Sequence, residues 1–309
     1  LQGLYCSLIG LSSLCLFVSG TRFRPMFAAL FVLAVAFLLL TGSRTSLYSF
    51  SCAVAALTWI VSTPFLRACW ITGGIAVFAE NLRAGRTTIC KVTSAYLDRI
   101  ESLDAKLGAF QYVAKEQAMA AAEAMDKLLA SGTDLGPLMG VPIGIKDIYA
   151  VDQMPTTNGS LFDASGITGS EGRFVTGLKQ AGCIILGKTK TVEFALGATG
   201  VNEARGTPWN PWDLKVHRTP GGSSSGSGVA TAAGLCAFAM GSDTGGSVRI
   251  PACFNGIFGH KTSIGLLPTD GVFPLSPTLD TLGPLTRNAA DAAIIHAIMT
   301  GSDLSLIHI

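Results

Sequence analysis

Two glycine- and serine-rich segments and one lysine are the parts of this sequence with the residue types for nucleophilic attack on a carbonyl group. The segments are Gly-Gly-Ser-Ser-Ser-Gly-Ser-Gly at 221–228 and Ser-Asp-Thr-Gly-Gly-Ser at 242–247. The lysine, Lys146, ends the apolar run 141–145. Such attack needs a nucleophile, a group that moves its proton, and fixed donors for the developing oxyanion. Serine hydroxyls and the N–H groups of a glycine turn suit the first and last needs.

Histidine is a poor candidate for the base. None of the four histidines lies in a turn of small residues, which argues against a Ser-His-Asp triad: His217, His260, His296 and His308. Residues 222–226 match Gly-x-Ser-x-Gly with Ser224 at the centre, but that pattern must follow a strand. The preceding residues, 209–220, do not resemble a strand. We therefore do not expect Ser224 to be the nucleophile.

Lys146 can replace histidine as the base if it is buried, because desolvation disfavours the ammonium form and lowers the pKa. It follows Val-Pro-Ile-Gly-Ile, so a strand could carry its amine into the interior while Asp147 points to the other face. Taken alone, Lys146 leaves another interpretation open. It could pack its stem at a strand end and keep its charge in water.

The elements that must position these residues are those of an α/β sheet. Apolar residues spaced three or four apart predict a helix over 89–103, and an alanine-rich stretch predicts another over 114–130. Short apolar runs at 141–145 and 183–186 predict buried strands, separated by a helix over 172–181. Strands that alternate with helices indicate an α/β sheet.

Three later segments complete this pattern. Residues 195–220 lack periodicity and are rich in Gly, Pro, Asn and Trp, which predicts a long ordered loop. Residues 229–240 predict a helix leading into a short strand, between the two glycine-serine segments. The last helix is expected over 289–300, with Asn288 as its N-cap.

Three blocks of the sequence closely resemble the amidase signature family. They are GVPIGIKDI at 140–148, PGGSSSGS at 220–227 and GSDTGGSVRIPA at 241–252. A weaker resemblance extends from about 75 to about 301 and includes LDTLGPLTR at 279–287. Three blocks in order are far more specific than one glycine-rich match. The resemblance implies a large mixed β-sheet flanked by helices, and hydrolysis of a carboxylic amide to acid and ammonia or amine.

The resemblance also implies a Ser-cisSer-Lys triad. Ser247 would be the nucleophile, Lys146 the base, and Ser223 the serine between them, after a cis peptide bond from Gly222. Neutral Lys146 would take a proton from Ser223, which takes one from Ser247. This chemistry needs no metal or cofactor, and the sequence has no Cys-x-x-Cys pair that would suggest a zinc site.

The residues around Ser247 have expected supporting roles. Thr244, Gly245 and Gly246 would form the oxyanion hole, because two residues without Cβ let successive N–H groups turn toward one oxygen. Four further residues are expected to support the site, the last by holding the loop electrostatically: Gly222, Ser224, Asp243 and Arg249. Thr156, Thr157 and Asn158 either line the substrate cleft or form a plain turn. Trp209 and Trp212 are expected to pack the long loop rather than line the cleft.

The N-terminal quarter has a different composition. The first 79 residues hold four arginines and no acidic residue, whereas the whole chain of 309 residues carries 22 basic and 20 acidic side chains. An unbroken apolar run covers 26–40. We expect residues 1–70 to be a membrane anchor or multispan segment. A signal peptide, or translated non-coding sequence, are the alternatives. The anchor would make the protein membrane-associated, and without it a cytoplasmic location is expected.

Composition also limits the partners. With 49% apolar and 14% charged residues and a net charge of +2, the chain is neither disordered nor a basic nucleic-acid-binding protein. A small-molecule amide is the expected partner, with no direct nucleic-acid contact, and a homodimer is left open. Residues 71–309 would form the N-terminal and catalytic part of an amidase domain whose C-terminal part is missing. The alternatives are a glutamine-hydrolysing subunit of a tRNA-dependent amidotransferase and a catalytically incomplete membrane-tethered fragment.

Overall fold

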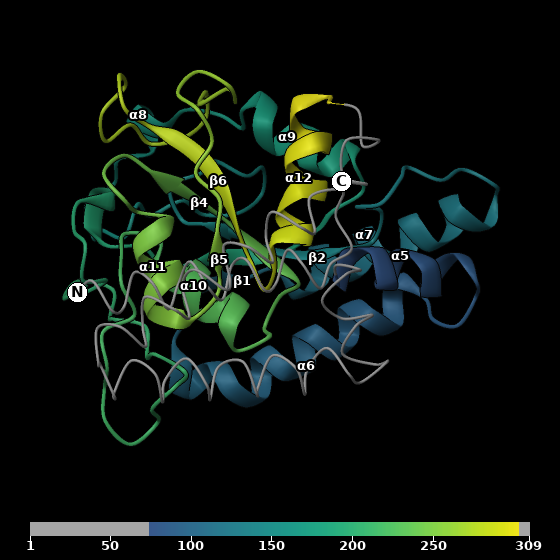
Figure 1. Ribbon diagram of the computed structural model, residues 1–309, viewed down its shortest axis with the longest axis horizontal. Coiled ribbons are helices and arrows are strands. Elements are labelled where there is room, and N and C mark those ends of the chain that lie inside the picture. Colours follow the sequence, from purple (N-terminus) through teal and green to yellow (C-terminus); the bar gives the residue numbers. More distant parts are fainter. Residues whose placement is uncertain (1–73, 303–309) are drawn as a thin grey trace, which may run out of the picture. The chain divides into compact units, whose positions relative to one another are not determined.

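A six-stranded mixed sheet forms the centre of the computed structural model, which describes residues 74–302 (Figure 1). In spatial order the strands are β1 (Phe110–Val113), β3 (Ile184–Thr189), β2 (Pro142–Lys146), β4 (Phe238–Asp243), β6 (Thr281–Thr286) and β5 (Phe258–Gly259). The central strands β3, β2 and β4 are parallel. β1 pairs antiparallel with β3, β6 with β4, and β5 with β6. The predicted α/β architecture with a mixed sheet is confirmed.

Helices flank this sheet in the described part of the chain. They are α5 (Gly74–Arg83), α6 (Ile89–Leu107), α7 (Lys115–Ala130), α8 (Ser165–Thr168), α9 (Arg173–Gln180), α10 (Ser225–Ala232), α11 (Arg249–Asn255) and α12 (Ala289–Thr300), with the short 3₁₀ helix η1 (Glu193–Ala195). α6, α7, α9 and α12 lie where the apolar periodicity predicts helices. The predicted N-cap is confirmed, because the Asn288 side chain accepts the N–H of Asp291 at 2.8 Å.

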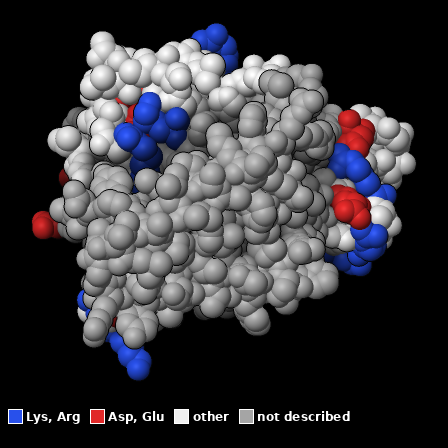
Figure 2. Space-filling model, in the orientation of Figure 1, with Lys and Arg blue, Asp and Glu red and all other residues white. Residues whose placement is uncertain are grey.

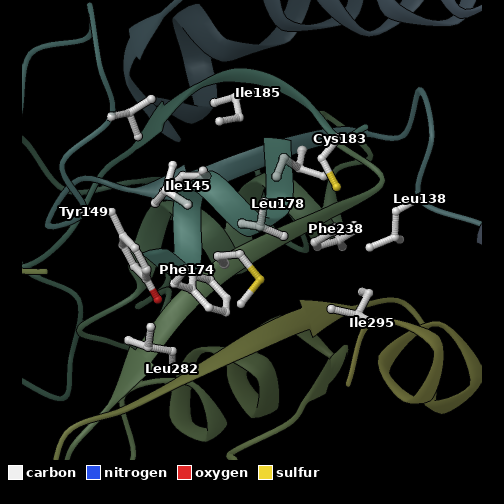
Figure 3. Close-up of a cluster of buried hydrophobic side chains, with 14 of the residues drawn as sticks. Leu138, Ile145, Tyr149, Phe174, Leu178, Cys183, Ile185, Phe238, Leu282 and Ile295 are labelled. Atoms are coloured by element: carbon white, nitrogen blue, oxygen red, sulfur yellow. The ribbon is translucent and has the colours of Figure 1, made fainter. Parts of the chain in front are cut away.

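Both faces of the sheet are buried, by different helices. On one face, Ile143 and Ile145 of β2 belong to a cluster that also contains Phe174 of α9 and Ile295 of α12 (Figure 3). On the other face, β3 contributes to a cluster with residues of α6, α7 and α10. Strands covered on both faces are apolar along their whole length, which is why β2 and β3 are recognisable in the sequence as short continuous apolar runs.

β6 was not predicted as a strand, for a physical reason. Its sequence, Thr-Leu-Gly-Pro-Leu-Thr, contains a glycine and a proline, which disfavour strands. Gly283 is nonetheless required there, because a Cβ at this position would lie 2.0 Å from the carbonyl oxygen of His260. The antiparallel pairing of β6 with β4 places Thr281 opposite Asp243.

The predicted membrane or targeting segment, residues 1–70, lies outside the described residues. Among residues 74–302, no helix combines the length and apolar character that crossing a bilayer requires. The division into segments 1–70 and 71–309 therefore stays a prediction. On the face shown in Figure 2, basic and acidic side chains of the described residues lie next to one another, as expected from their nearly equal numbers in the sequence.

Candidate active site

The predicted site residues meet at the carboxyl ends of the parallel strands. Lys146 is the last residue of β2, and Asp243 is the last residue of β4. Ser223 lies two residues before α10, and Ser247 lies in the turn between β4 and α11. Parallel strands end at the same edge of a sheet, where polar groups from different loops converge. The fold therefore brings together residues that are far apart in the sequence.

The amine of Lys146 is fully buried and hydrogen-bonded. Its Nζ donates to Ser223 Oγ at 2.7 Å and to Ser242 Oγ at 2.8 Å. Burial lowers the pKa of Lys146 to about 7, against the opposing effect of the negative charges of Asp243 and Asp280. The alternative of a lysine with its charge in water is wrong, and near neutral pH the amine can lose its proton.

Ser223 is held rigidly on its backbone side. The Gly222–Ser223 peptide bond is cis. The Ser223 carbonyl oxygen accepts the N–H of Val192 and the hydroxyl of Thr191, both at 3.1 Å. A Cβ at Gly222 would lie 2.7 Å from the carbonyl oxygen of Gly197, so only glycine fits there. These contacts fix the Ser223 hydroxyl beside Lys146.

Ser247 lies near the surface of the site, with 9% of its area exposed. Its carbonyl oxygen accepts the N–H of Ser224 at 3.2 Å, which joins the two glycine-serine segments. Among the hydrogen bonds of residues 74–302, none links the hydroxyls of Ser247 and Ser223. Catalytic hydrogen bonds are often long without substrate and shorten when it binds.

The turn Thr244–Ser247 differs from the expectation at Gly246. The N–H of Gly246 donates to Asp243 Oδ1 at 2.8 Å, so it is not available to an oxyanion. In the described part of the chain, the N–H groups of Thr244, Gly245 and Ser247 donate no hydrogen bond. Gly246 is needed for its shape instead, because its φ is +131° and a Cβ would lie 2.7 Å from Ile250.

Asp243 holds this turn through a network around its buried carboxylate. Arg249 donates to it from Nε at 3.0 Å and from a terminal nitrogen at 2.9 Å, and the N–H of Val248 donates at 3.1 Å. Burial alone would raise the pKa of Asp243, but the hydrogen bonds and charge of Arg249 hold it below its ordinary value. Half of Arg249 faces solvent, and its contacts are those of a residue that holds the loop.

Ser224 and Ser242 connect the two segments beneath the site. The Ser224 hydroxyl lies 3.3 Å from both the N–H and the carbonyl oxygen of Ser242. Ser242, the second partner of Lys146, was not predicted. The signal that could have identified it is its place in the block that also contains Ser247, on a strand next to the strand of Lys146.

Thr156, Thr157 and Asn158 surround a buried ion pair. Lys188 and Asp147 are 3.0 Å apart and almost wholly buried. Thr157 donates to Asp147 from both its N–H and its hydroxyl, and Lys188 donates to the Thr156 hydroxyl at 2.8 Å. Burial lowers the pKa of Lys188, and the charge of Asp147 opposes this shift. These contacts correspond to the turn rather than the cleft-lining alternative.

Replacing Lys188 with Met is expected to destabilise the chain by about 3–5 kcal/mol, because it leaves the Asp147 carboxylate buried without its partner. The free energy of unfolding, measured with denaturant, checks this prediction. Lys115→Met is the control, since Lys115 pairs with Glu101 on the exposed surface and should change little. Equal stability of the two variants would contradict the assignment.

The aromatic residues of the long loop pack against the loop itself. Trp209 stacks on His217 with ring centroids 4.1 Å apart, and Lys106 Nζ lies 3.4 Å from the Trp209 ring centroid. Trp212 is 74% exposed and donates to the carbonyl oxygen of Asn255. His217 also contacts the carbonyl oxygen of Pro208. The contacts of His217 are therefore made within the loop.

A pocket lies beside Ser242 and is lined mainly by apolar residues. Its lining comprises Ile148, Ser242, Thr269, Val272, Phe273, Pro274, Leu275, Pro277, Asp280 and Leu282. Ser242 thus faces both Lys146 and this pocket. Within residues 74–302, no three His, Cys, Asp or Glu side chains form a group that could hold a metal ion.

Comparison with known proteins identifies the family. The family model described as Amidase matches residues 91–307 of this chain. The chain belongs to the amidase family. The resemblance of the three sequence blocks is thereby confirmed, and all three blocks lie within the residues that match the amidase family.

Known relatives of this amidase chain include proteins with different names. It is 45% identical over 225 residues to the A-type subunit of the glutamyl-tRNA(Gln) amidotransferase of Acidothermus cellulolyticus, covering 73% of this chain and 44% of the relative. It is 41% identical over 225 residues to 2-amino-5-chloromuconic acid deaminase of Comamonas testosteroni, covering 73% and 49%. The amidase chain thus spans about half the length of these relatives.

Solved structures of amidases share its fold. The native peptide amidase from Stenotrophomonas maltophilia superposes with a TM-score of 0.70 at 35% identity, over 76% of this chain and 49% of the other. A bacterial aryl acylamidase of the amidase signature family gives a TM-score of 0.66 at 30% identity, over 73% and 47%. The amidase-signature α/β fold is therefore shared over the described core.

Proposed function

We propose that the protein hydrolyses a carboxylic amide through an acyl-enzyme on Ser247. The observation that carries this proposal is the buried amine of Lys146, which has a pKa of about 7 and donates to Ser223 Oγ at 2.7 Å. A lysine with such a pKa is neutral in a large fraction of molecules near pH 7 and can then act as a base. Membership of the amidase family supports the same reaction.

The proposed reaction moves one proton in and out of Lys146. Neutral Lys146 accepts the Ser223 proton while Ser223 accepts the Ser247 proton, and Ser247 Oγ attacks the amide carbon. As the C–N bond breaks, the Lys146 ammonium returns its proton through Ser223 to the leaving amine. Water then attacks the ester of Ser247 by the same proton path, which releases the acid and restores the enzyme.

The free donors of the turn would stabilise the oxyanion. The N–H groups of Thr244, Gly245 and Ser247 have no acceptor within residues 74–302, so they are available to an oxygen that becomes negative during attack. Gly246 is excluded from this role because its N–H is held by Asp243. Donors that are already oriented stabilise the transition state without reorganisation.

Labelling with a fluorophosphonate tests the proposal. The reagent should form an adduct on Ser247, mapped by mass spectrometry, because attack on phosphorus expels fluoride and mimics acylation. The rate should fall about tenfold per pH unit below pH 7, since protonated Lys146 cannot accept the Ser223 proton. Ser263→Ala is the control, because Ser263 is exposed and lies outside the site. An adduct on another serine, or a flat pH profile, would contradict the proposal.

Two substrate classes follow from separate observations. The N-terminal apolar segment favours apolar amides held near a membrane. The relatives named as subunits of glutamyl-tRNA(Gln) amidotransferase favour glutamine, with transfer of the ammonia by a partner protein. Ammonia release from glutamine, compared with amine release from long-chain amides, separates the two. Copurification with a tRNA-binding subunit would further support the second class.

The covered length bears on whether the chain acts alone. Because it spans about half of its relatives, a catalytically incomplete fragment is a further proposal. Failure of the purified chain to unfold cooperatively, together with absence of Ser247 labelling, would support this alternative. Membrane association through residues 1–70 is a separate proposal, tested by flotation of the chain with lipid vesicles.

A further inference from the structure

Protonation of Lys146 creates a buried positive charge that needs a counter-charge. Two carboxylates act electrostatically on Lys146, those of Asp243 and Asp280. Asp243 is already paired with Arg249, whose Nε and terminal nitrogen lie 3.0 and 2.9 Å from its oxygens. The charges of this pair largely cancel at a distance. Asp243 is therefore a weak counter-charge for Lys146.

Asp280 has no cationic partner among residues 74–302. Its Oδ1 accepts the hydroxyl of Thr244, and its Oδ2 accepts the N–H groups of Leu275 and Ser276 at 3.0 and 2.9 Å. Three neutral donors and no acceptor are the partners that an ionised carboxylate requires. Asp280 is partly buried, and it lines the same pocket as Ser242.

The other ionisable groups near Lys146 leave Asp280 as the source of net charge. Asp147, the next residue in the chain, is paired with Lys188 of the neighbouring strand β3 at 3.0 Å. Tyr149 donates its hydroxyl to the carbonyl oxygen of Gly241, and burial raises its pKa, so it is neutral. On β4, Asp243 is paired with Arg249.

We propose that Asp280 is a positioning residue of this site, whose negative charge stabilises the Lys146 ammonium and whose hydrogen bond with Thr244 fixes the turn that carries Ser247. The inference rests on the proposed function and adds a residue to it. Asp280 lies just before β6, whose first residue pairs with the last residue of β4. It therefore connects the pocket wall at 275–276 with the oxyanion turn.

Asp280→Asn tests the role of the charge. Asparagine keeps an acceptor oxygen for Thr244 but removes the negative charge, so the Lys146 ammonium becomes harder to form. The acid limb of the rate of Ser247 labelling should move to lower pH by about one unit. Thr244→Val keeps the charge and removes the hydrogen bond, so it should lower the rate without moving the limb. Asp270→Asn is the matched control, because Asp270 is exposed and paired with Arg173, and should move neither.

The outcomes separate this inference from the proposed function. If the unsubstituted chain shows no Ser247 adduct or no acid limb, the proposed function fails first. If that limb is present and Asp280→Asn leaves it unmoved, the role of Asp280 is overturned. Should Asp280→Asn fail to fold, Asp280→Glu and Asp280→Ser are compared, since only Glu keeps the charge. A shifted limb with Ser alone supports the proposal, and equal limbs reject it.

Discussion

The chain with Ser247→Ala is expected to lose both amide hydrolysis and fluorophosphonate labelling. Among the described residues, no other hydroxyl combines a place beside the free N–H groups of the turn with access to solvent, because Ser223 and Ser242 are held by the Lys146 amine. A serine hydrolase that loses its nucleophile typically loses on the order of 10⁶-fold in rate. Product formation and adduct mapping by mass spectrometry measure the effect.

The control for this prediction is Ser263→Ala, which removes an exposed hydroxyl outside the site and should leave both readouts unchanged. The far-ultraviolet circular dichroism of the two variants should match, since Ser247 donates no hydrogen bond from its side chain in the described structure. Residual labelling of Ser247→Ala at Ser223 would mean that the nucleophile has been misassigned.

Replacing Lys146 with Met is expected to lower the rate of Ser247 acylation by about 10²- to 10⁴-fold, the usual contribution of a positioned base. Met fills nearly the volume of the lysine stem, so the core around β2 should remain packed. The acid limb near pH 7 should also disappear, because the group whose pKa is about 7 has been removed. Initial rates between pH 5 and pH 9 measure both effects.

Lys190→Met is the matched control for that variant. Lys190 follows β3 directly and burial also lowers its pKa, but its charge partner is Asp104 rather than the serines of the site. It should therefore keep the acid limb. His217→Ala should likewise change little, since His217 stacks on Trp209 within the loop. A requirement for His217, or an acid limb that survives Lys146→Met, would contradict the triad.

Most helices and central strands could be predicted because their signals are local. Apolar periodicity located α6 and α7, and continuous apolar runs located β2 and β3, since these segments bury one or both faces. β6 escaped because its Gly283 and Pro284 are unfavourable for a strand in isolation. Only close packing against the chain near His260 explains the glycine. Local propensity contains no information about such a neighbour.

The sequence by itself determined which residues are candidates for chemistry. Three motif blocks singled out Lys146, Ser223 and Ser247, and the glycines before Ser247 indicated a turn with free N–H groups. Residue type and spacing are sufficient for this, because a nucleophile, a base and a glycine turn are each recognisable within a short segment.

Tertiary structure alone decided how these candidates act. It buried the Lys146 amine, gave it Ser242 as a second partner, and engaged the Gly246 N–H with Asp243. It also left Asp280 without a cation among the described residues. A pKa and the availability of an N–H group depend on desolvation and on neighbours from distant segments. These are set when β2, β4 and β6 come together in one sheet.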